Sequence, residues 1–282
     1  MDLKLIKKLD YFNMYANLGF QFDGIDKFEK YTIAYHNKIK DYWYNFITDI
    51  KADTKEEFDK IILEAIPKMK AKDREVTIAV LPFMKEIYNN RDTYFDDNYE
   101  LVSNEVWQIY DNLDNINNIN TNCLLNVKLE KTTNMQLYSE EMIKAYQTGD
   151  ADDPYGDLDS VYKEVYENHK KIKNEYTEEF FFAKVNDKIV GVTSSLYDNE
   201  IYGIYGLAVK KEFRCKGIGK EIIKQQLQMC KDKKLKIAFL QTEDGYYPAD
   251  TYRKLGFKDV CTVYYYIKKK WVKENFVWIK LH

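Results

Sequence analysis

Two glycines that closely follow an arginine mark the stretch of this chain with the clearest chemical potential. The segment reads IYGLAVKKEFRCKGIGKEII, with Gly217 and Gly219 at the start of a predicted amphipathic helix. Glycine allows close backbone approach to a ligand, and the first N–H groups of a helix lack intrahelical partners at its positive end. Positive side chains are supplied by Arg214, Lys216 and Lys220. The pattern predicts a backbone cradle for a phosphate or pyrophosphate.

The spacing of these glycines differs from both standard nucleotide loops. The chain contains no GxxxxGK[ST] motif and no GxGxxG motif with an acidic residue about 20 positions later. Taken alone, the segment is equally consistent with an ordinary helix start that contains turn glycines. The interpretation therefore depends on the rest of the chain.

The elements that position this loop are expected to alternate between strands and helices. Hydrophobic periodicity predicts strands at 124–130, 180–185, 189–197, 201–209, 236–241, 257–267 and 276–281, and helices at 134–148, 158–173, 217–231 and 249–255. The Asn186-Asp187 turn predicts an antiparallel hairpin. The fold class is α/β (α+β), with a mixed, mostly antiparallel central sheet and helices on both faces.

Two motifs at this point resemble a known family. Arg214-Cys-Lys-Gly217-Ile-Gly219 resembles the Arg/Gln-x-x-Gly-x-Gly/Ala signature of the GNAT superfamily of N-acetyltransferases, and Tyr252-Arg-Lys-Leu-Gly256-Phe257 resembles its Tyr-x-x-x-Gly-Phe element. The predicted element order agrees, and the resemblance covers about residues 126–282. It implies a GNAT-like fold and acetyl-CoA as cosubstrate, with no metal.

The resemblance also implies roles for individual residues. The pantetheine arm would pair with the backbone of Leu207, Ala208 and Val209, and the pyrophosphate would lie on Arg214, Cys215, Lys216, Gly217, Ile218, Gly219 and Lys220. Tyr252 would protonate the departing thiolate, since a tyrosine with a pKa of about 10 is protonated at neutral pH. The segment EDGYYPA at 243–249 departs from the family by lacking a common Asn, which bears on the pantetheine contacts.

Direct attack on a thioester requires a neutral amine, so a base should accept its proton. Glu200, at the start of the motif strand, and Glu243, at the end of the next, are the candidates. Either could instead be a solvated surface glutamate.

An acidic loop at 149–159 is the candidate acceptor region. Asp152 and Asp153 lie among five aspartates there, and a concentration of one charge sign attracts counter-ions. The alternative is an ordinary helix cap and a solvated surface. The first interpretation favours a cationic amine as acceptor.

The first half of the chain contains a fainter copy of the same pattern. A strand at 76–81, a helix at 83–90 and a strand at 99–110 are preceded by a predicted strand at 42–51 and a helix at 55–69, but the turn between those last two lacks a glycine pair. We expect a degenerate GNAT-like domain at 1–111, an Asn/Asp-rich linker at 112–123 and a catalytic domain at 124–282. An unrelated α/β cap is the alternative for the first.

Overall composition excludes several classes of protein. With 45% hydrophobic and 16% aromatic residues the 282-residue chain can build full cores, and a net charge of −3 gives no global footprint for nucleic acid or anionic membrane. The cysteines at 123, 215, 230 and 261 show neither metal nor disulfide spacing. No signal peptide or 18-residue apolar run occurs, so a cytoplasmic location is expected.

The predicted function is acetyl-CoA-dependent N-acetyl transfer to a primary amine, with a small cationic amine as the expected acceptor. Two alternatives remain open: acetylation of a protein N-terminal or lysine amine, and a non-catalytic regulatory protein that binds acetyl-CoA. The pattern does not identify the acceptor or the oligomeric state.

Overall fold

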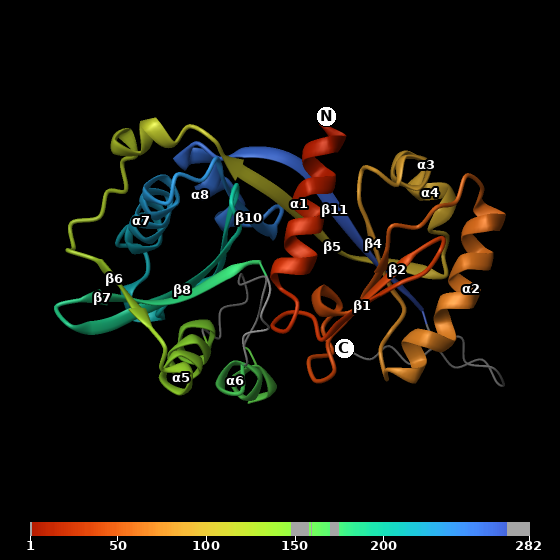
Figure 1. Cartoon of the computed structure of the whole chain (residues 1–282), viewed down its shortest axis with the longest axis horizontal. Helices are drawn as coiled ribbons and strands as arrows, with labels where there is room; N and C mark the ends of the chain where they lie inside the picture. The colour runs from red at the N-terminus through yellow and green to blue at the C-terminus, as the bar shows by residue number, and fades with distance from the viewer. Residues whose placement is uncertain (1, 148–157, 159, 170–174, 270–282) are drawn as a thin grey trace.

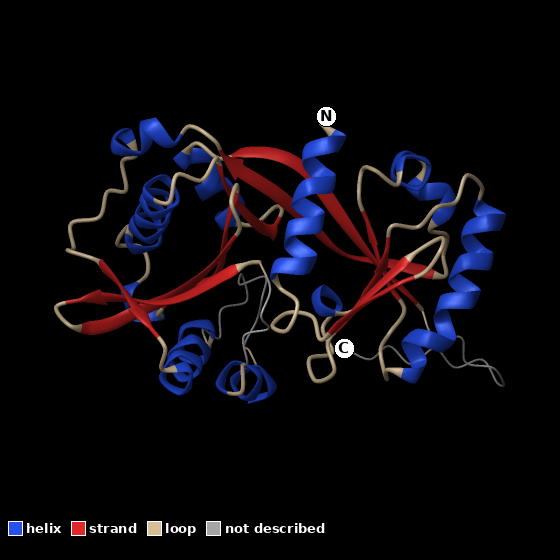
Figure 2. Ribbon diagram, viewed as in Figure 1, coloured by secondary structure: helices blue, strands red, loops and turns tan. Residues whose placement is uncertain are grey.

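The structure is a computed structural model that describes residues 2–147, 158, 160–169 and 175–269. One continuous sheet of eleven strands runs through this part of the chain (Figures 1 and 2). In order across the sheet, the strands are β1 (Gly24–Lys27), β2 (Thr32–Tyr35), β3 (Phe46–Thr48), β4 (Thr77–Val80), β11 (Lys258–Lys268), β5 (Tyr99–Tyr110), β10 (Ile237–Glu243), β9 (Ile201–Val209), β8 (Lys188–Tyr197), β7 (Thr177–Val185) and β6 (Lys128–Thr132).

Neighbouring strands are antiparallel except for the parallel pairs β3–β4 and β9–β10. The predicted fold class, a mixed and mostly antiparallel sheet with helices on both faces, is therefore confirmed.

The two halves of the chain exchange a strand at the centre of this sheet. β5 belongs to the first half, yet both of its neighbours, β10 and β11, come from the second half. Conversely, β11 follows all the other second-half strands that the structure describes, and it pairs with β5 and β4, both from the first half. The antiparallel β5–β11 pair runs from Ile109 opposite Lys258 to Tyr99 opposite Lys268. Neither half completes its own sheet.

Helices cover both faces of the sheet (Figure 1). They are α1 (Leu3–Ala16), α2 (Lys55–Ala71), α3 (Lys85–Asn89), α4 (Arg91–Tyr94), α5 (Met135–Tyr146), α6 (Ser160–Glu167), α7 (Ile218–Asp232) and α8 (Tyr247–Leu255). α7 and α8 pack on the face that carries Tyr202, Ala238 and Leu240. α1 packs on the opposite face, over Trp107 and Phe239, and α5 and α6 cover the same face over β7 and β8.

Local patterns predicted most second-half elements closely. β9 has the predicted bounds, and Asn186 and Asp187 both have positive φ, as a tight hairpin turn requires. The predicted strand at 42–51 is wrong in part, because the chain forms a short 3-10 helix, η1 (Tyr42–Tyr44), before β3. The predicted strand at 276–281 and the acidic loop, with Asp152 and Asp153, lie outside the described residues.

The predicted linker at 112–123 packs along α7. It contains a 3-10 helix, η2 (Leu113–Asn118), and its Ile116 and Ile119 are buried in the cluster that includes α7. Lys224 Nζ donates to Ile119 O at 3.0 Å, and Thr121 Oγ1 donates to Glu221 Oε2 at 3.0 Å. The segment is thus fixed to the helix. The domain boundary itself stays a prediction.

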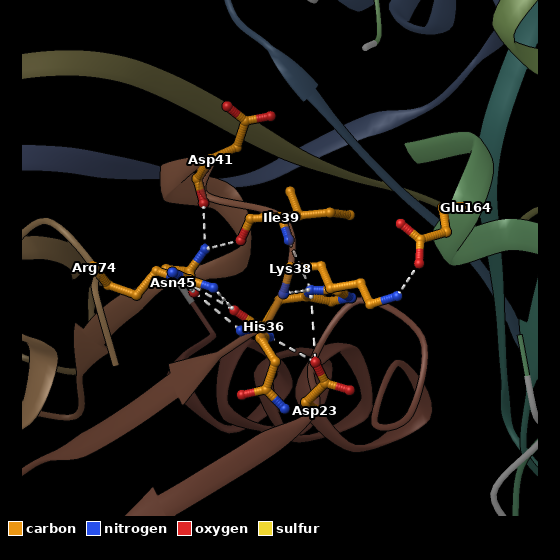
Figure 3. Close-up of polar contacts among 9 residues, drawn as sticks. Asp23, His36, Lys38, Ile39, Asp41, Asn45, Arg74 and Glu164 are labelled. Atoms are coloured by element: carbon orange, nitrogen blue, oxygen red, sulfur yellow. Dashed lines mark hydrogen bonds and ion pairs between the residues drawn. The ribbon is translucent and has the colours of Figure 1, made fainter. Parts of the chain in front are cut away.

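A buried arginine organises the loop that carries η1 (Figure 3). Arg74 Nε and Nη2 donate to His36 O at 3.0 and 2.6 Å, and Nε also donates to Asn45 Oδ1 at 3.0 Å. Asn45 Nδ2 in turn donates to the carbonyls of Ile39 and Asp41. The loop therefore satisfies its main-chain groups without a strand partner, which holds η1 in place beside the centre of the sheet.

Candidate active site

The parallel pair β9–β10 separates part of the way along. Ile201, Tyr202 and Gly203 pair with Ile237, Ala238 and Phe239, and no further pair joins the two strands. β9 continues beside β8, whereas β10 continues beside β5. We call the gap between 204–209 of β9 and 240–243 of β10 the strand opening.

A β-bulge in β9 accompanies this separation. Tyr205 pairs with Ser194, and Ala208 pairs with Val192. Between these two pairs β9 contains one residue more than β8. The extra residue falls at Gly206 or Leu207, and Gly206 has a φ of 56°. A bulge bends its strand and interrupts the hydrogen-bond ladder. The opening can therefore accept an extended ligand as an additional strand on Leu207, Ala208 and Val209.

The loop after β9 leads to an uncapped helix start. Gly217, at the N-cap of α7, has a φ of 77°, and no side chain among the described residues caps this helix. A Cβ on Gly217 would lie 2.6 Å from Thr121 O and 2.9 Å from Cys123 N, so only glycine fits. The first hydrogen bond to the helix runs from Glu221 N to Gly217 O at 3.0 Å. The N–H groups of the preceding residues are therefore available to an anion.

Gly219, one residue into α7, borders the strand opening. A Cβ there would have only Val209 Cγ2 at 3.9 Å and Leu207 Cδ2 at 4.0 Å as its nearest neighbours. The predicted pyrophosphate loop and the predicted pantetheine strand are thus adjacent. This arrangement fits a ligand with a phosphate group at one end and an extended arm at the other.

The basic residues of the loop have different roles. Arg214 Nε donates to Val209 O at 2.9 Å and Nη2 to Ala145 O at 3.2 Å, which ties the loop to β9 and α5. Lys216 Nζ donates to Glu212 O at 2.9 Å. Lys220 lies in the first turn of α7, and Cys215 is exposed with a φ of 60°.

The equivalent helix of the first half begins differently. α2 follows β3, which has β4 as a parallel neighbour, just as α7 follows β9, which has β10 as a parallel neighbour. Its N-cap, Thr54, accepts from Glu57 N at 3.2 Å, and Glu57 Oε2 accepts from Asp53 N at 3.0 Å. We call this arrangement the capping box of α2, although its glutamate accepts from the residue before the N-cap; it fills the helix start with acidic groups, which disfavours an anion.

Tyr252 lies on α8, which begins soon after β10 ends. Its ring centroid is 5.8 Å from that of Phe257, and the side chain is partly buried in the cluster under α7. Arg253 pairs with Asp244, Asp250 and Asp259 at 2.8–2.9 Å, so α8 is fixed between the end of β10 and the start of β11.

The two predicted base residues lie at opposite ends of the strands. Glu243 ends β10, where it accepts from Ser103 Oγ and, at 3.1 Å, from Asn104 N. Burial raises the pKa of Glu243 above its usual value, and the hydrogen bonds from these two donors offset only part of that rise. Glu200 precedes β9 and pairs with Lys8 and, at 3.0 Å, with Lys236. The structure brings Glu243 to the opening and leaves Glu200 at the far end of β9.

Sequence reasoning did not single out Glu105. It lies on β5 directly opposite Glu243, and Trp107 Nε1 donates to its Oε1 at 2.7 Å. Burial, with a smaller contribution from Glu243, raises its pKa to about 7. The alternation of residues along β5 predicts that Ser103, Glu105 and Trp107 share one face of the strand. The sequence does not predict that β5 lies beside β10, which is what places Glu105 opposite Glu243.

The part of the chain that the structure describes was also examined for metal sites and membrane-spanning helices. No group of three or more His, Cys, Asp or Glu side chains there could hold a metal ion. No helix among those residues combines the length and apolar character needed to span a membrane.

Comparisons with known proteins agree with this geometry. Residues 135–257 match the model of the acetyltransferase (GNAT) family. A conserved protein of unknown function from Staphylococcus epidermidis ATCC 12228 has a similar structure, with a TM-score of 0.63 and 15% identity, over 88% of this chain and 94% of that one. A GCN5-related N-acetyltransferase from Kribbella flavida gives a TM-score of 0.60 with 11% identity, over 87% and 89%.

A tandem GNAT protein from the clavulanic acid biosynthesis pathway is also similar, with a TM-score of 0.56 and 10% identity, over 84% of this chain and 77% of that one. The search of curated proteins found no match. At these identities the solved structures establish the fold, and the tandem protein extends it over both halves of the chain.

Proposed function

Because residues 135–257 match the model of the acetyltransferase (GNAT) family, we propose that this protein transfers the acetyl group of acetyl-CoA to a primary amine, with a small cationic amine as acceptor. The observation that carries the proposal is the continuity of the strand opening with the uncapped start of α7. An arm and a phosphate group of one ligand can occupy both.

The residues present fit this ligand. Leu207, Ala208 and Val209 would offer main-chain groups to the pantetheine arm beyond the bulge. The N–H groups at the start of α7 would hold the pyrophosphate, with Lys216 and Lys220 nearby, and Arg214 would keep the loop in place through Val209 O. A Cβ at Gly219 would project into this space.

The chemistry requires two proton transfers. The amine nitrogen forms a bond to the acetyl carbon as the carbon–sulfur bond breaks. Tyr252 gives its hydroxyl proton to the sulfur, and a carboxylate takes the proton from nitrogen. Of the two predicted candidates, Glu243 borders the opening because it ends β10, whereas Glu200 lies at the far end of β9.

A cationic acceptor is favoured by the partly buried carboxylates of Glu105 and Glu243 beside the opening. In a site of low dielectric, adjacent carboxylates stabilise a positive ligand. Asp152 and Asp153 would add to this attraction if the acidic loop borders the acceptor.

We place the catalytic machinery in residues 124–282 and treat residues 1–111 as a degenerate copy. The capping box of α2 supports this assignment, because Thr54 and Glu57 occupy the position that corresponds to the cradle. The first half still completes the sheet through β5.

An acetylation assay over a panel of amines, reporting free CoA thiol, tests the proposal. The panel should include polyamines, amino sugars, amino acids and a lysine-containing peptide. We expect turnover with small cationic amines and none with Gly219→Glu. Turnover only with the peptide would favour protein acetylation, and acetyl-CoA binding without any turnover would favour a regulatory binding protein.

A further inference from the structure

The strand lent by the first half places a second carboxylate beside Glu243. Glu105 lies directly opposite Glu243 on β10 and opposite Val263 on β11. Directly opposite residues of a sheet share a face, and their Cβ atoms lie about 4.5–5.5 Å apart. This is the face under α1, since the neighbouring Trp107 and Phe239 pack there. Glu105, from the first half, therefore lies beside Glu243, from the second half.

The two carboxylates are held differently. Glu243 accepts from Ser103 Oγ and Asn104 N, which satisfies its charged form on both oxygens. Glu105 Oε1 accepts from Trp107 Nε1, and no donor in the described residues reaches its Oε2. Two adjacent carboxylates cannot both ionise easily, and the less well solvated one retains a proton to higher pH. Glu105 is therefore the member of the pair that takes and releases a proton.

The groups that face Glu105 reinforce this difference. They are Glu243 from β10, Tyr205 from β9, Tyr42 from η1, and Cys261 and Tyr265 from β11. None of these groups is a cation. Burial is the largest influence, Glu243 adds to it, and the pKa of Glu105 rises to about 7. A base is most effective when its pKa is near the working pH.

Glu105 lies one strand away from the strand opening, opposite the residue that ends β10. Its hydrogen-bond donor, Trp107, lies directly opposite Gln241, which is one of the β10 residues that border the opening. Gln241 Nε2 is buried, and no described group accepts its hydrogen bond. Tyr205, on the β9 side, donates to Asn13 Oδ1 of α1 at 3.2 Å. A buried amide without a partner beside a base is a polar site prepared for a ligand atom.

We propose that Glu105 accepts the proton of the acceptor amine during acetyl transfer, with Glu243 as the fixed charge beside it and Trp107 as the positioning residue. The inference rests on the proposed function and deepens it. As the nitrogen–carbon bond forms and the carbon–sulfur bond breaks, the N–H proton passes to Glu105 Oε2 and the Tyr252 proton passes to sulfur. Solvent then returns both residues to their starting states, so the atoms and charges balance.

The test compares Glu105→Gln with the wild type and with Glu100→Gln, an exposed control on the same strand. At pH 7, using the best amine of the panel, we expect Glu105→Gln to lower kcat/KM about 10²- to 10⁴-fold. Its acetyl-CoA affinity by calorimetry should be unchanged, and Glu100→Gln should match the wild type. The wild-type plot of log kcat/KM against pH should rise to an inflection near 7 that Glu105→Gln lacks.

Two further variants keep the test informative if Glu105→Gln does not fold. Glu105→Asp retains a carboxylate and should retain an inflection. Trp107→Phe removes a donor that stabilises the charged carboxylate, so the inflection should move to higher pH. A purely structural role for Trp107 would lower the rate without moving the inflection, which would contradict the proposal.

Failure of this inference and failure of the proposed function look different. A wild type that acetylates amines, with Glu105→Gln keeping its rate within about twofold or its inflection near pH 7, overturns the role of Glu105 alone. A wild type that binds acetyl-CoA but acetylates no amine on the panel overturns the proposed function, and with it this role.

Discussion

Replacing Gly219 by glutamate should stabilise the free protein while abolishing acetyl-CoA binding. The side chain has room, because the nearest atoms to an added Cβ are Val209 Cγ2 at 3.9 Å and Leu207 Cδ2 at 4.0 Å. Replacing a helical glycine gains about 0.5–1 kcal/mol, and an acidic group in the first turn adds about 0.3–1 kcal/mol. The melting temperature of the free protein should therefore rise by about 1–3 °C.

Binding should change in the opposite direction. A glutamate at this position would place a negative charge about 4 Å from a bound phosphate, and two like unit charges at that distance repel by about 4 kcal/mol at an effective dielectric constant near 20. That energy corresponds to a loss of affinity of about 10³-fold. Calorimetric titration with acetyl-CoA measures the affinity, and thermal unfolding without ligand measures the stability.

The matched control is Gly219→Lys, which adds similar bulk with the opposite charge. Its affinity should fall far less than that of Gly219→Glu, because only steric exclusion opposes binding. Unchanged affinity in Gly219→Glu would refute the assignment of the α7 start as the pyrophosphate site. Equal losses in both variants would refute the electrostatic part of the reasoning.

Four other outcomes are expected. Tyr252→Phe keeps the ring packing on Phe257, so kcat should fall about 10²- to 10⁴-fold in the acetylation assay while acetyl-CoA affinity stays constant. Replacing Asp152 and Asp153 together by Asn should raise KM for a cationic amine at low salt, and the difference should shrink at high salt; no change at either salt level would exclude a steering role. Gly217→Ala should destabilise the protein by more than the 1–2 kcal/mol of left-handed strain, because its Cβ would also meet Thr121 O at 2.6 Å; equal denaturant midpoints for variant and wild type would contradict this. Arg74→Met should cost about 1–3 kcal/mol for each buried carbonyl left without its donor, measured by the same denaturant titration, and an unchanged midpoint would mean that water replaces the guanidinium.

Local sequence patterns predicted the elements that depend on neighbours in the chain. The β9 strand, the loop with Gly217 and Gly219, and the α7 helix follow from hydrophobic period and glycine placement within about 30 residues. The uncapped helix start was predictable for the same reason, because no Ser, Thr, Asp or Asn stands at the N-cap position.

A choice between Glu200 and Glu243 as the base requires knowledge of which strands are neighbours and in which direction they run. Parallel strands bring their carboxyl ends to one edge, so a residue at the end of β10 and one at the start of β9 lie at opposite edges. That argument separates Glu243 from Glu200 once the two strands are known to be parallel neighbours. Periodicity alone does not identify strand neighbours.

The strand exchange had no local signal at all. The segment YELVSNEVWQIY predicts a strand, and β5 has the predicted bounds. Its partners Ile237–Glu243 and Lys258–Lys268 lie far along the chain, and nothing in the residues of β5 identifies them. Glu105 was missed for that reason, since its chemistry depends on which residue stands opposite.

The exchanged strands also set an order on the synthesis of this protein. β5 leaves the ribosome with neither of its partners made, and β11, which closes the sheet between β4 and β5, follows roughly 160 residues later. At about 5–20 residues per second, the sheet stays incomplete at β5 for on the order of 8–30 s, until β11 is made. Unpaired apolar edges template aggregation, so the nascent first half is the stage at which chaperones are most needed. Halves expressed separately would each carry an unpaired sheet edge, so we expect each half to aggregate unless the other half is present to pair with it.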